Sequence, residues 1–174
     1  MYSCMVREVP APAALVEMSQ AFERSVMGER RRTGRPPTMS DICYRLLDTR
    51  RALREGEILN PSEVLAVAEE MELALEHWKS QLQSGWSFAV ADAAEDPTGV
   101  FYEGKRHVYQ NLWMAQVWNN WRTLRLSVSQ LVLESERQLR AADSDRSLAA
   151  LAVIHELSAE ICTSAAGFAG SPRQ

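Results

Sequence analysis

The chain has 174 residues, a net charge of −4 and a hydrophobic fraction of 46 %, which describe a globular protein with enough length for a sizeable core. These values argue against a disordered chain and against a generally nucleic-acid-binding surface. Three widely spaced cysteines, Cys4, Cys43 and Cys162, fit free thiols in a reducing compartment better than a disulfide framework. We see neither a secretory leader nor an apolar run of about 18 residues, so we expect a soluble intracellular protein without a membrane partner.

Two helices are predicted in the first third of the chain. The first, over 10–27, is amphipathic, and its apolar positions are Leu15, Met18, Phe22 and Val26. Gly, two prolines and several charges then predict a loop or linker over 28–38. Its arginines are interpreted as a solvated basic loop, in preference to a nuclear-import signal or a phosphate contact. Ser40 is a suitable N-cap for a second helix that ends near Glu55.

A third helix begins at Asn60-Pro61, which supply an N-cap residue and a proline at the first helical position. It should end near Gly85. Its apolar positions keep an unbroken 4–3 repeat: Val64, Ala68, Met71, Leu75, Trp78 and Leu82. The glutamates on its other faces are interpreted as a solvated acidic face, because no histidine or second acid stands at a spacing that suggests a metal site.

The periodicity is lost between 86 and 105, where Asp96-Pro97-Thr98-Gly99 is typical of a turn. We expect an irregular connector that packs on the core and buries Trp86. A short strand is the alternative, although the sequence shows no partner strand for it.

The stretch 109–133 contains three of the five tryptophans and neither Gly nor Pro, and it predicts the central helix of the fold, from about 105 to 140. His107, at the start of this helix, is interpreted as a packing residue in preference to a ligand-binding one. The apolar seam of this helix is Met114, Val117, Trp121, Leu124, Val128 and Leu131. The fold class is therefore all-α, with about five helices in an irregular bundle around this helix and a single domain over 1–174.

The last helix should start at Ser144 or Asp145. Its predicted core positions are Leu148, Leu151, Ile154 and Ile161, with His155 and Cys162 as core-lining residues on an adjoining face. His155 and Cys162 are separated by about 10 Å along the helix axis, which is too far for a Cys–His catalytic dyad.

Sequence motifs for zinc, for a nucleotide or for a catalytic site are missing, so we expect no cofactor and no enzymatic activity. One group is nevertheless unusual: Asn119, Asn120, Arg122 and Arg125 lie among tryptophans on the most apolar helix. Such polar groups must be hydrogen-bonded or reach solvent. Either they line a pocket for a small molecule or a partner, or the arginines tie neighbouring loops and helix ends to the core. The second interpretation is favoured.

Residues 107–126, HVYQNLWMAQVWNNWRTLRL, resemble the hallmark stretch of the fungal-specific transcription factor regulatory domain, which in many fungal regulators follows a six-cysteine binuclear zinc cluster. The matching residues are Tyr109, Trp113, Ala115, Trp118-Asn119, Trp121-Arg122 and Arg125. A second segment is similar to the family's "ICASVP": Ile161, Cys162 and Ser164 match, and alanines replace Val-Pro at 165–166. Gly85-Trp86 is compatible as well, so the resemblance covers about 85–170.

The resemblance implies a nuclear, all-helical domain that acts in transcriptional regulation through protein partners or a small effector. The zinc cluster needs six closely spaced cysteines, which this sequence lacks, so neither zinc nor direct DNA binding is carried over. The candidate effector or partner site is Trp118, Asn119, Trp121, Arg122 and Arg125. Because the family domain normally continues further, we expect a partial domain that exposes apolar surface on Leu148–Ala166 and self-associates. The alternative is a cytoplasmic helical protein-interaction or scaffold module.

Overall fold

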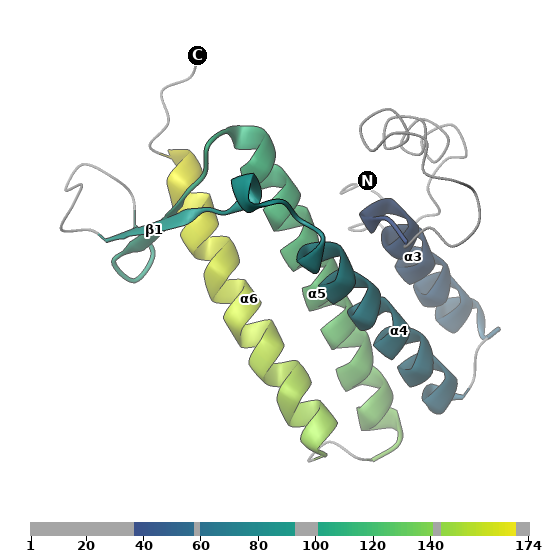
Figure 1. Cartoon of the computed structure of the whole chain (residues 1–174). Helices are drawn as coiled ribbons and strands as arrows, with labels where there is room; N and C mark the ends of the chain where they lie inside the picture. Colours follow the sequence, from purple (N-terminus) through teal and green to yellow (C-terminus); the bar gives the residue numbers. More distant parts are fainter. Residues whose placement is uncertain (1–36, 58–59, 93–100, 141–143, 170–174) are drawn as a thin grey trace, which may run out of the picture. The chain divides into compact units, whose positions relative to one another are not determined.

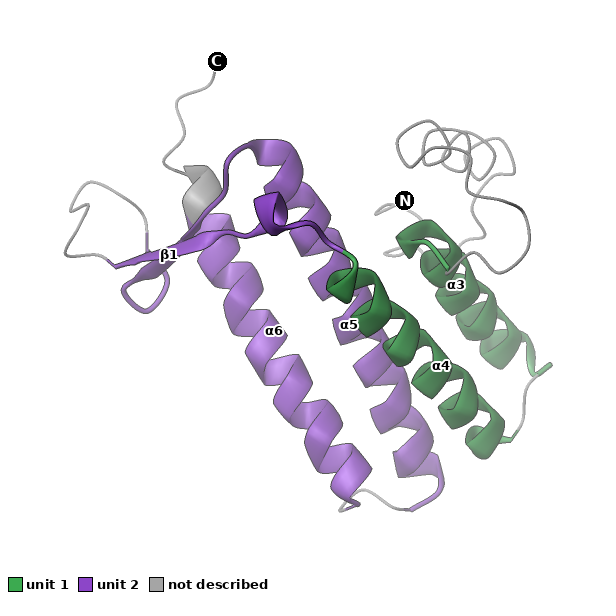
Figure 2. Cartoon of the chain, in the orientation of Figure 1, with its two compact units in different colours: residues 1–81 green, residues 82–174 purple. Residues whose placement is uncertain are grey.

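The computed structural model describes residues 37–57, 60–92, 101–140 and 144–169. They belong to two compact units, Met1–Gln81 and Leu82–Gln174 (Figure 2). The elements are α3 (Met39–Glu55), α4 (Pro61–Ser80), the short 3-10 helix η1 (Ser84–Trp86), β1 (Ala89–Asp92), β2 (Lys105–Val108), α5 (Leu112–Gln138) and α6 (Asp145–Ala169) (Figure 1).

The described part of the chain is mostly helical, which confirms the helical character that the sequence predicts. It contains four α-helices instead of about five, together with a small two-stranded sheet that was not expected. The helix predicted over 10–27, and most of the loop predicted over 28–38, lie outside the described residues.

Local signals at the helix ends define α3 and α4. Thr38, two residues before the predicted N-cap Ser40, caps α3 in a reciprocal capping box with Asp41. The helix stops at Gly56, whose φ of 73° is left-handed. Asn60 caps α4 by accepting a hydrogen bond from the Ser62 backbone N–H at 3.0 Å, as the sequence predicts. α4 ends at Ser80, well before Gly85, because the chain turns into η1.

In the described part of the first unit, α3 packs against α4 (Figure 1). An ion pair between Arg45 and Glu70 connects the two helices at the surface. The predicted repeat of α4 is confirmed at four positions, which are fully or nearly fully buried: Val64, Ala68, Met71 and Leu75.

The second unit contains a β-hairpin where the sequence predicts an irregular connector. β1 pairs with β2 in antiparallel register, from Ala89 opposite Val108 to Asp92 opposite Lys105. The expectation of no partner strand was wrong because the two strands are only four residues long and are separated by twelve residues. Trp86, predicted to be buried, is only half-buried at the end of η1.

α5 is the long central helix that the sequence predicts, but it begins at Leu112 and not near 105. The residues before it pair in β2, so His107 lies on a strand and not at a helix start. Asn111 caps α5 by accepting a hydrogen bond from the Met114 backbone N–H at 2.9 Å. The predicted apolar seam is confirmed, since all six of its residues are buried: Met114, Val117, Trp121, Leu124, Val128 and Leu131.

α6 packs along α5 and also contacts β2 (Figure 1). Its start is fixed by Ser144, whose Oγ accepts from the Ser147 backbone N–H and donates to Glu136 near the end of α5. Glu136 is buried and also accepts from Arg146 at 3.1 Å. The hydrogen bond from Ser144 and the charge of Arg146 lower the pKa of Glu136, against the opposing effect of burial. This cluster joins the facing ends of the two helices.

The face that α6 turns inward is not the one that the sequence predicts. Leu148 and Leu151, predicted to be in the core, are 56 % and 49 % exposed, and His155 and Cys162 are exposed as well. The buried residues of α6 are mostly small: Ser147, Ala150, Leu157, Thr163, Ser164 and Ala166. Small residues allow close helix packing, and their register places Ser164 in a polar network with α5. By length and composition alone, the segment Asp145–Ala166 would be sufficient to cross a membrane.

Candidate functional site

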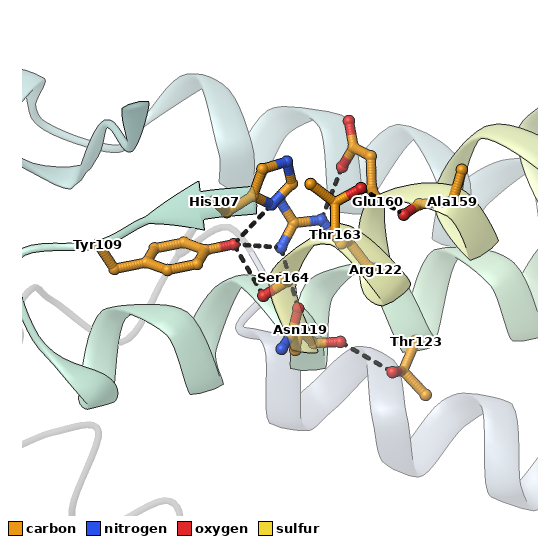
Figure 3. A network of polar contacts seen from close by, with 9 residues as sticks. All are labelled: His107, Tyr109, Asn119, Arg122, Thr123, Ala159, Glu160, Thr163 and Ser164. Carbon is orange, nitrogen blue, oxygen red and sulfur yellow. Dashed lines mark hydrogen bonds and ion pairs between the residues drawn. The ribbon is translucent and has the colours of Figure 1, made fainter. Parts of the chain in front are cut away.

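Arg122 lies at the centre of a polar network inside the second unit (Figure 3). Its side chain has no exposed surface. The guanidinium Nε donates to Glu160 Oε2 at 2.6 Å, and Nη1 donates to Tyr109 Oη at 2.8 Å and to Asn119 Oδ1 at 3.0 Å. Nη2 lies 3.4 Å from His107 Nδ1. The buried cation is therefore both ion-paired and hydrogen-bonded, as a charge in such a place must be.

Three elements contribute to this network (Figure 3). β2 supplies His107, and Tyr109 follows directly after the strand; α5 supplies Asn119 and Arg122 one turn apart; α6 supplies Glu160 and Ser164 one turn apart. Tyr109 Oη is 3.0 Å from Ser164 Oγ, which connects the end of the hairpin to α6. The network therefore ties the hairpin and both helices of the unit together.

Aromatic rings enclose the guanidinium of Arg122. Its Cζ lies 5.0 Å from the ring centre of Phe88 and 5.6 Å from that of Trp118, within the range of cation–π attraction. Phe88 also packs against His107, with ring centres 4.4 Å apart. Trp118 donates its indole N–H to the Trp86 carbonyl oxygen at 2.8 Å, which anchors the segment before β1 to α5. Polar and aromatic contacts thus fix the same arginine.

His107 is held in its neutral form. Burial, with a further contribution from the Arg122 charge, lowers its pKa from 6.5 to about 4, against the opposing effect of Glu160. Since Nδ1 faces a guanidinium that can only donate, Nδ1 should be the acceptor nitrogen and Nε2 should carry the proton. Tyr109 Oη lies 3.1 Å from this nitrogen, and its O–H donates to Ser164 Oγ at 3.0 Å.

The stability of the second unit should depend on His107 between about pH 4 and pH 6.5. In this window the unfolded chain binds a proton that the folded chain does not, so stability rises with pH. At most about 3 kcal/mol should be lost as the pH falls from 6.5 to 4. Urea unfolding across this range measures the loss. His107→Asn, which keeps an acceptor near the Nδ1 position, should remove this component, and an unchanged pH profile in that variant would contradict the assignment.

The geometry of the network favours a structural tie over catalysis. Arg122 and Glu160 neutralise each other, and the acceptor nitrogen of His107 already faces the Arg122 guanidinium. A ligand that reached Arg122 would first have to displace one of its protein partners. In the part of the chain that the structure describes, no group of three or more His, Cys, Asp or Glu residues could hold a metal ion.

The residues of the predicted site have different roles in the structure. Trp118 and Arg122 belong to the enclosed cluster, and Asn119 is half-buried at its edge. Trp121 is buried and packs edge-on against Trp118 at 5.8 Å. The Arg125 guanidinium lies 5.4 Å from the Trp121 ring centre, and the residue is partly exposed.

Other members of the network were not predicted as site residues. Tyr109 and Ser164 each belong to one of the two segments that carry the family resemblance, which was a usable signal. Phe88 and Glu160 gave no signal, because neither lies in a motif that points to Arg122. Comparisons with protein-family models, with curated proteins and with solved structures give no match.

Proposed function

We propose that this chain is a regulatory domain similar to that of fungal transcription factors, which acts in transcriptional regulation through a protein partner or a small effector and has no DNA-binding module of its own. The observation that carries the proposal is the contact between Tyr109 and Ser164 at 3.0 Å. These residues come from the two separate segments that resemble the family, and Arg122 of the first segment donates to the same tyrosine oxygen. A direct contact between the two segments supports the interpretation that both belong to one domain.

The state of the network supports a binding role and not an enzymatic one. Its buried arginine is fully enclosed, and its histidine is neutral and engaged. The parts of the network that an effector or partner can reach lie at its edge, where the Glu160 side chain is 34 % exposed and Asn119 is half-buried. Arg125, one turn beyond Arg122 on α5, is also partly exposed. We therefore place the effector or partner contact at this edge.

The purified chain should show no zinc-dependent binding to DNA. Its three cysteines cannot form the six-cysteine cluster through which the family is expected to bind CGG-type sites. Fluorescence anisotropy with a labelled CGG-containing duplex, with and without zinc, measures this, and a scrambled duplex is the matched control. Zinc-dependent, sequence-specific binding would overturn the proposal that the DNA-binding module is absent.

The alternative function is that of a cytoplasmic helical interaction or scaffold module. The location of the chain in the cell and the partners that it binds distinguish the two functions. A tagged full chain in a fungal host should enter the nucleus and recover transcription machinery or a sibling regulator. Fusion to a heterologous DNA-binding domain should also change the expression of a matching reporter. A chain that stays in the cytoplasm, leaves the reporter unchanged and recovers only cytoplasmic assemblies would favour the alternative.

A further inference from the structure

Two ion pairs in the described part of the second unit join α5 to α6, and they differ in which partner reaches solvent. In the pair of Arg146 and Glu136, the arginine side chain is 48 % exposed and the carboxylate is 5 % exposed. In the pair of Arg122 and Glu160, the arginine is fully buried and the carboxylate side chain is 34 % exposed. The second pair is therefore a buried cation whose counterion stands at the surface.

The two carboxylates are also held by different numbers of contacts. Glu136 accepts from Ser144 with one oxygen and from Arg146 with the other. Among the described residues, Glu160 has a single hydrogen bond, from Arg122 Nε to Oε2 at 2.6 Å. Its other oxygen points away from the guanidinium (Figure 3). Release of Glu160 would thus break one hydrogen bond and return a partly exposed carboxylate to water.

Glu160 uses only half of the guanidinium edge that it faces. Nε and Nη2 of an arginine present two parallel N–H groups, which a carboxylate commonly binds with both of its oxygens. Here Glu160 contacts Nε alone, and Nη2 has His107 Nδ1 at 3.4 Å, which is long for a hydrogen bond. This edge of Arg122 therefore has donor capacity that its present partners do not use fully.

The surroundings of this edge strengthen its attraction for an anion. The rings of Phe88 and Trp118 lie 5.0 Å and 5.6 Å from Arg122 Cζ, and the guanidinium is shielded from solvent. Charges attract each other more strongly where water is excluded. A second anion that replaced Glu160 would therefore meet a fixed, poorly hydrated cation.

We propose that the effector of this domain is a small organic carboxylate, which displaces Glu160 and binds Nε and Nη2 of Arg122 with its two oxygens. Glu160 is then an internal competitor that fills the site when the effector is absent. This inference rests on the proposed function only where it calls the ligand an effector, because binding of the carboxylate is measured without a transcriptional readout.

The burial of Arg122 selects a small molecule over a protein partner. Only a group that fits into the place of one carboxyl group reaches the guanidinium. The group that occupies the edge in the structure is itself a carboxylate, whose planar shape matches the paired N–H groups. When Glu160 is displaced, α6 keeps the hydrogen bond from Tyr109 to Ser164 but loses its ion pair with Arg122. Occupation of the site thus changes how α6 is held.

An NMR titration of the isotope-labelled full chain with sodium acetate tests the proposal. The ionic strength is held constant with sodium chloride, and acetamide is the uncharged control of the same shape. Acetate should shift the Nε–H signal of Arg122 in a saturable way, and acetamide should leave this signal in place. A signal that responds equally to both compounds, or to neither, would overturn the proposal.

Variants of the two acids on α6 separate displacement of Glu160 from a general effect of charge. Glu160→Gln removes the competing carboxylate and should tighten acetate binding by about tenfold or more. Glu156→Gln is the matched control, because Glu156 is exposed one turn earlier on α6 and its loss changes the net charge equally. It should leave the affinity nearly unchanged, and equal tightening in both variants would overturn the proposal.

Two further variants keep the test independent of the stability of Glu160→Gln. Glu160→Asp retains the charge but draws the carboxylate back from Nε, so it should also tighten acetate binding. Arg122→Lys keeps the cation and loses the paired N–H groups, so it should abolish binding, and unchanged binding in this variant would overturn the proposal. A chain that passes these tests but leaves the reporter unchanged would keep the carboxylate site and lose the transcriptional role.

Discussion

Replacing Arg122 with alanine is expected to lower the free energy of unfolding of the Leu82–Gln174 unit by about 3–5 kcal/mol. The substitution removes a fully buried guanidinium that donates to three different side chains. Glu160 loses its ion-pair partner, and the oxygens of Tyr109 and Asn119 lose a donor in surroundings with little water. The loss of these contacts, rather than the net contribution of the ion pair, accounts for the size of the effect.

Arg125→Ala is the matched control for this prediction. Arg125 lies one turn further along α5 and is partly exposed, where charge interactions are screened by water, so its removal should cost no more than about 1 kcal/mol. Urea unfolding followed by tryptophan fluorescence suits both variants, because four of the five tryptophans lie in this unit. If Arg122→Ala unfolds at the same urea concentration as Arg125→Ala, the network does not hold the unit together.

Trp118→Ala should destabilise the same unit by about 3–5 kcal/mol, the usual cost of truncating a buried aromatic residue. Trp118 is 8 % exposed, packs against Trp121 and Phe88, and donates to the Trp86 carbonyl oxygen. Trp118→Phe keeps a ring and loses mainly this hydrogen bond, so it should cost about 1–3 kcal/mol.

Trp113→Ala provides the comparison for Trp118→Ala, because it removes the same side chain from the same helix at a position that is 55 % exposed. Its effect should stay below about 1 kcal/mol. Far-UV circular dichroism in urea is the suitable measurement, since these substitutions alter the fluorescence itself. If both substitutions lower the free energy of unfolding by similar amounts, the contacts of the Trp118 indole contribute little to the stability of the unit.

Periodicity in the sequence predicts the presence and the buried face of a long helix better than it predicts where the helix begins and ends. The seam of α5 could be predicted because six apolar residues repeat over five turns, and each of them is buried. The hairpin could not, because β1 and β2 pair across an intervening segment and are too short for an alternating pattern. That pairing also moves the start of α5 to Leu112, where Asn111 supplies the cap.

α6 shows where apolar character misleads. Large side chains at Leu148 and Leu151 suggest a core face, yet the inward face is chosen by close packing of small residues and by the Ser164 hydrogen bond. Neither of these can be recognised before the partner helix is in place. The same distinction applies to the site: the unusual position of Arg122 was visible in the sequence, but its ion-pair partner Glu160 lies 38 residues away on another helix.

The network also selects one alignment of α5 with α6. An interface to which one helix contributes mostly small side chains would tolerate a shift of one helix along the other. A slip by one turn, about 5.4 Å, would carry Glu160 and Ser164 away from Arg122 and Tyr109 and leave a buried charge without its counterion. The arginine thus acts against competing helix registers, a role in fold specificity that differs from its contribution to stability.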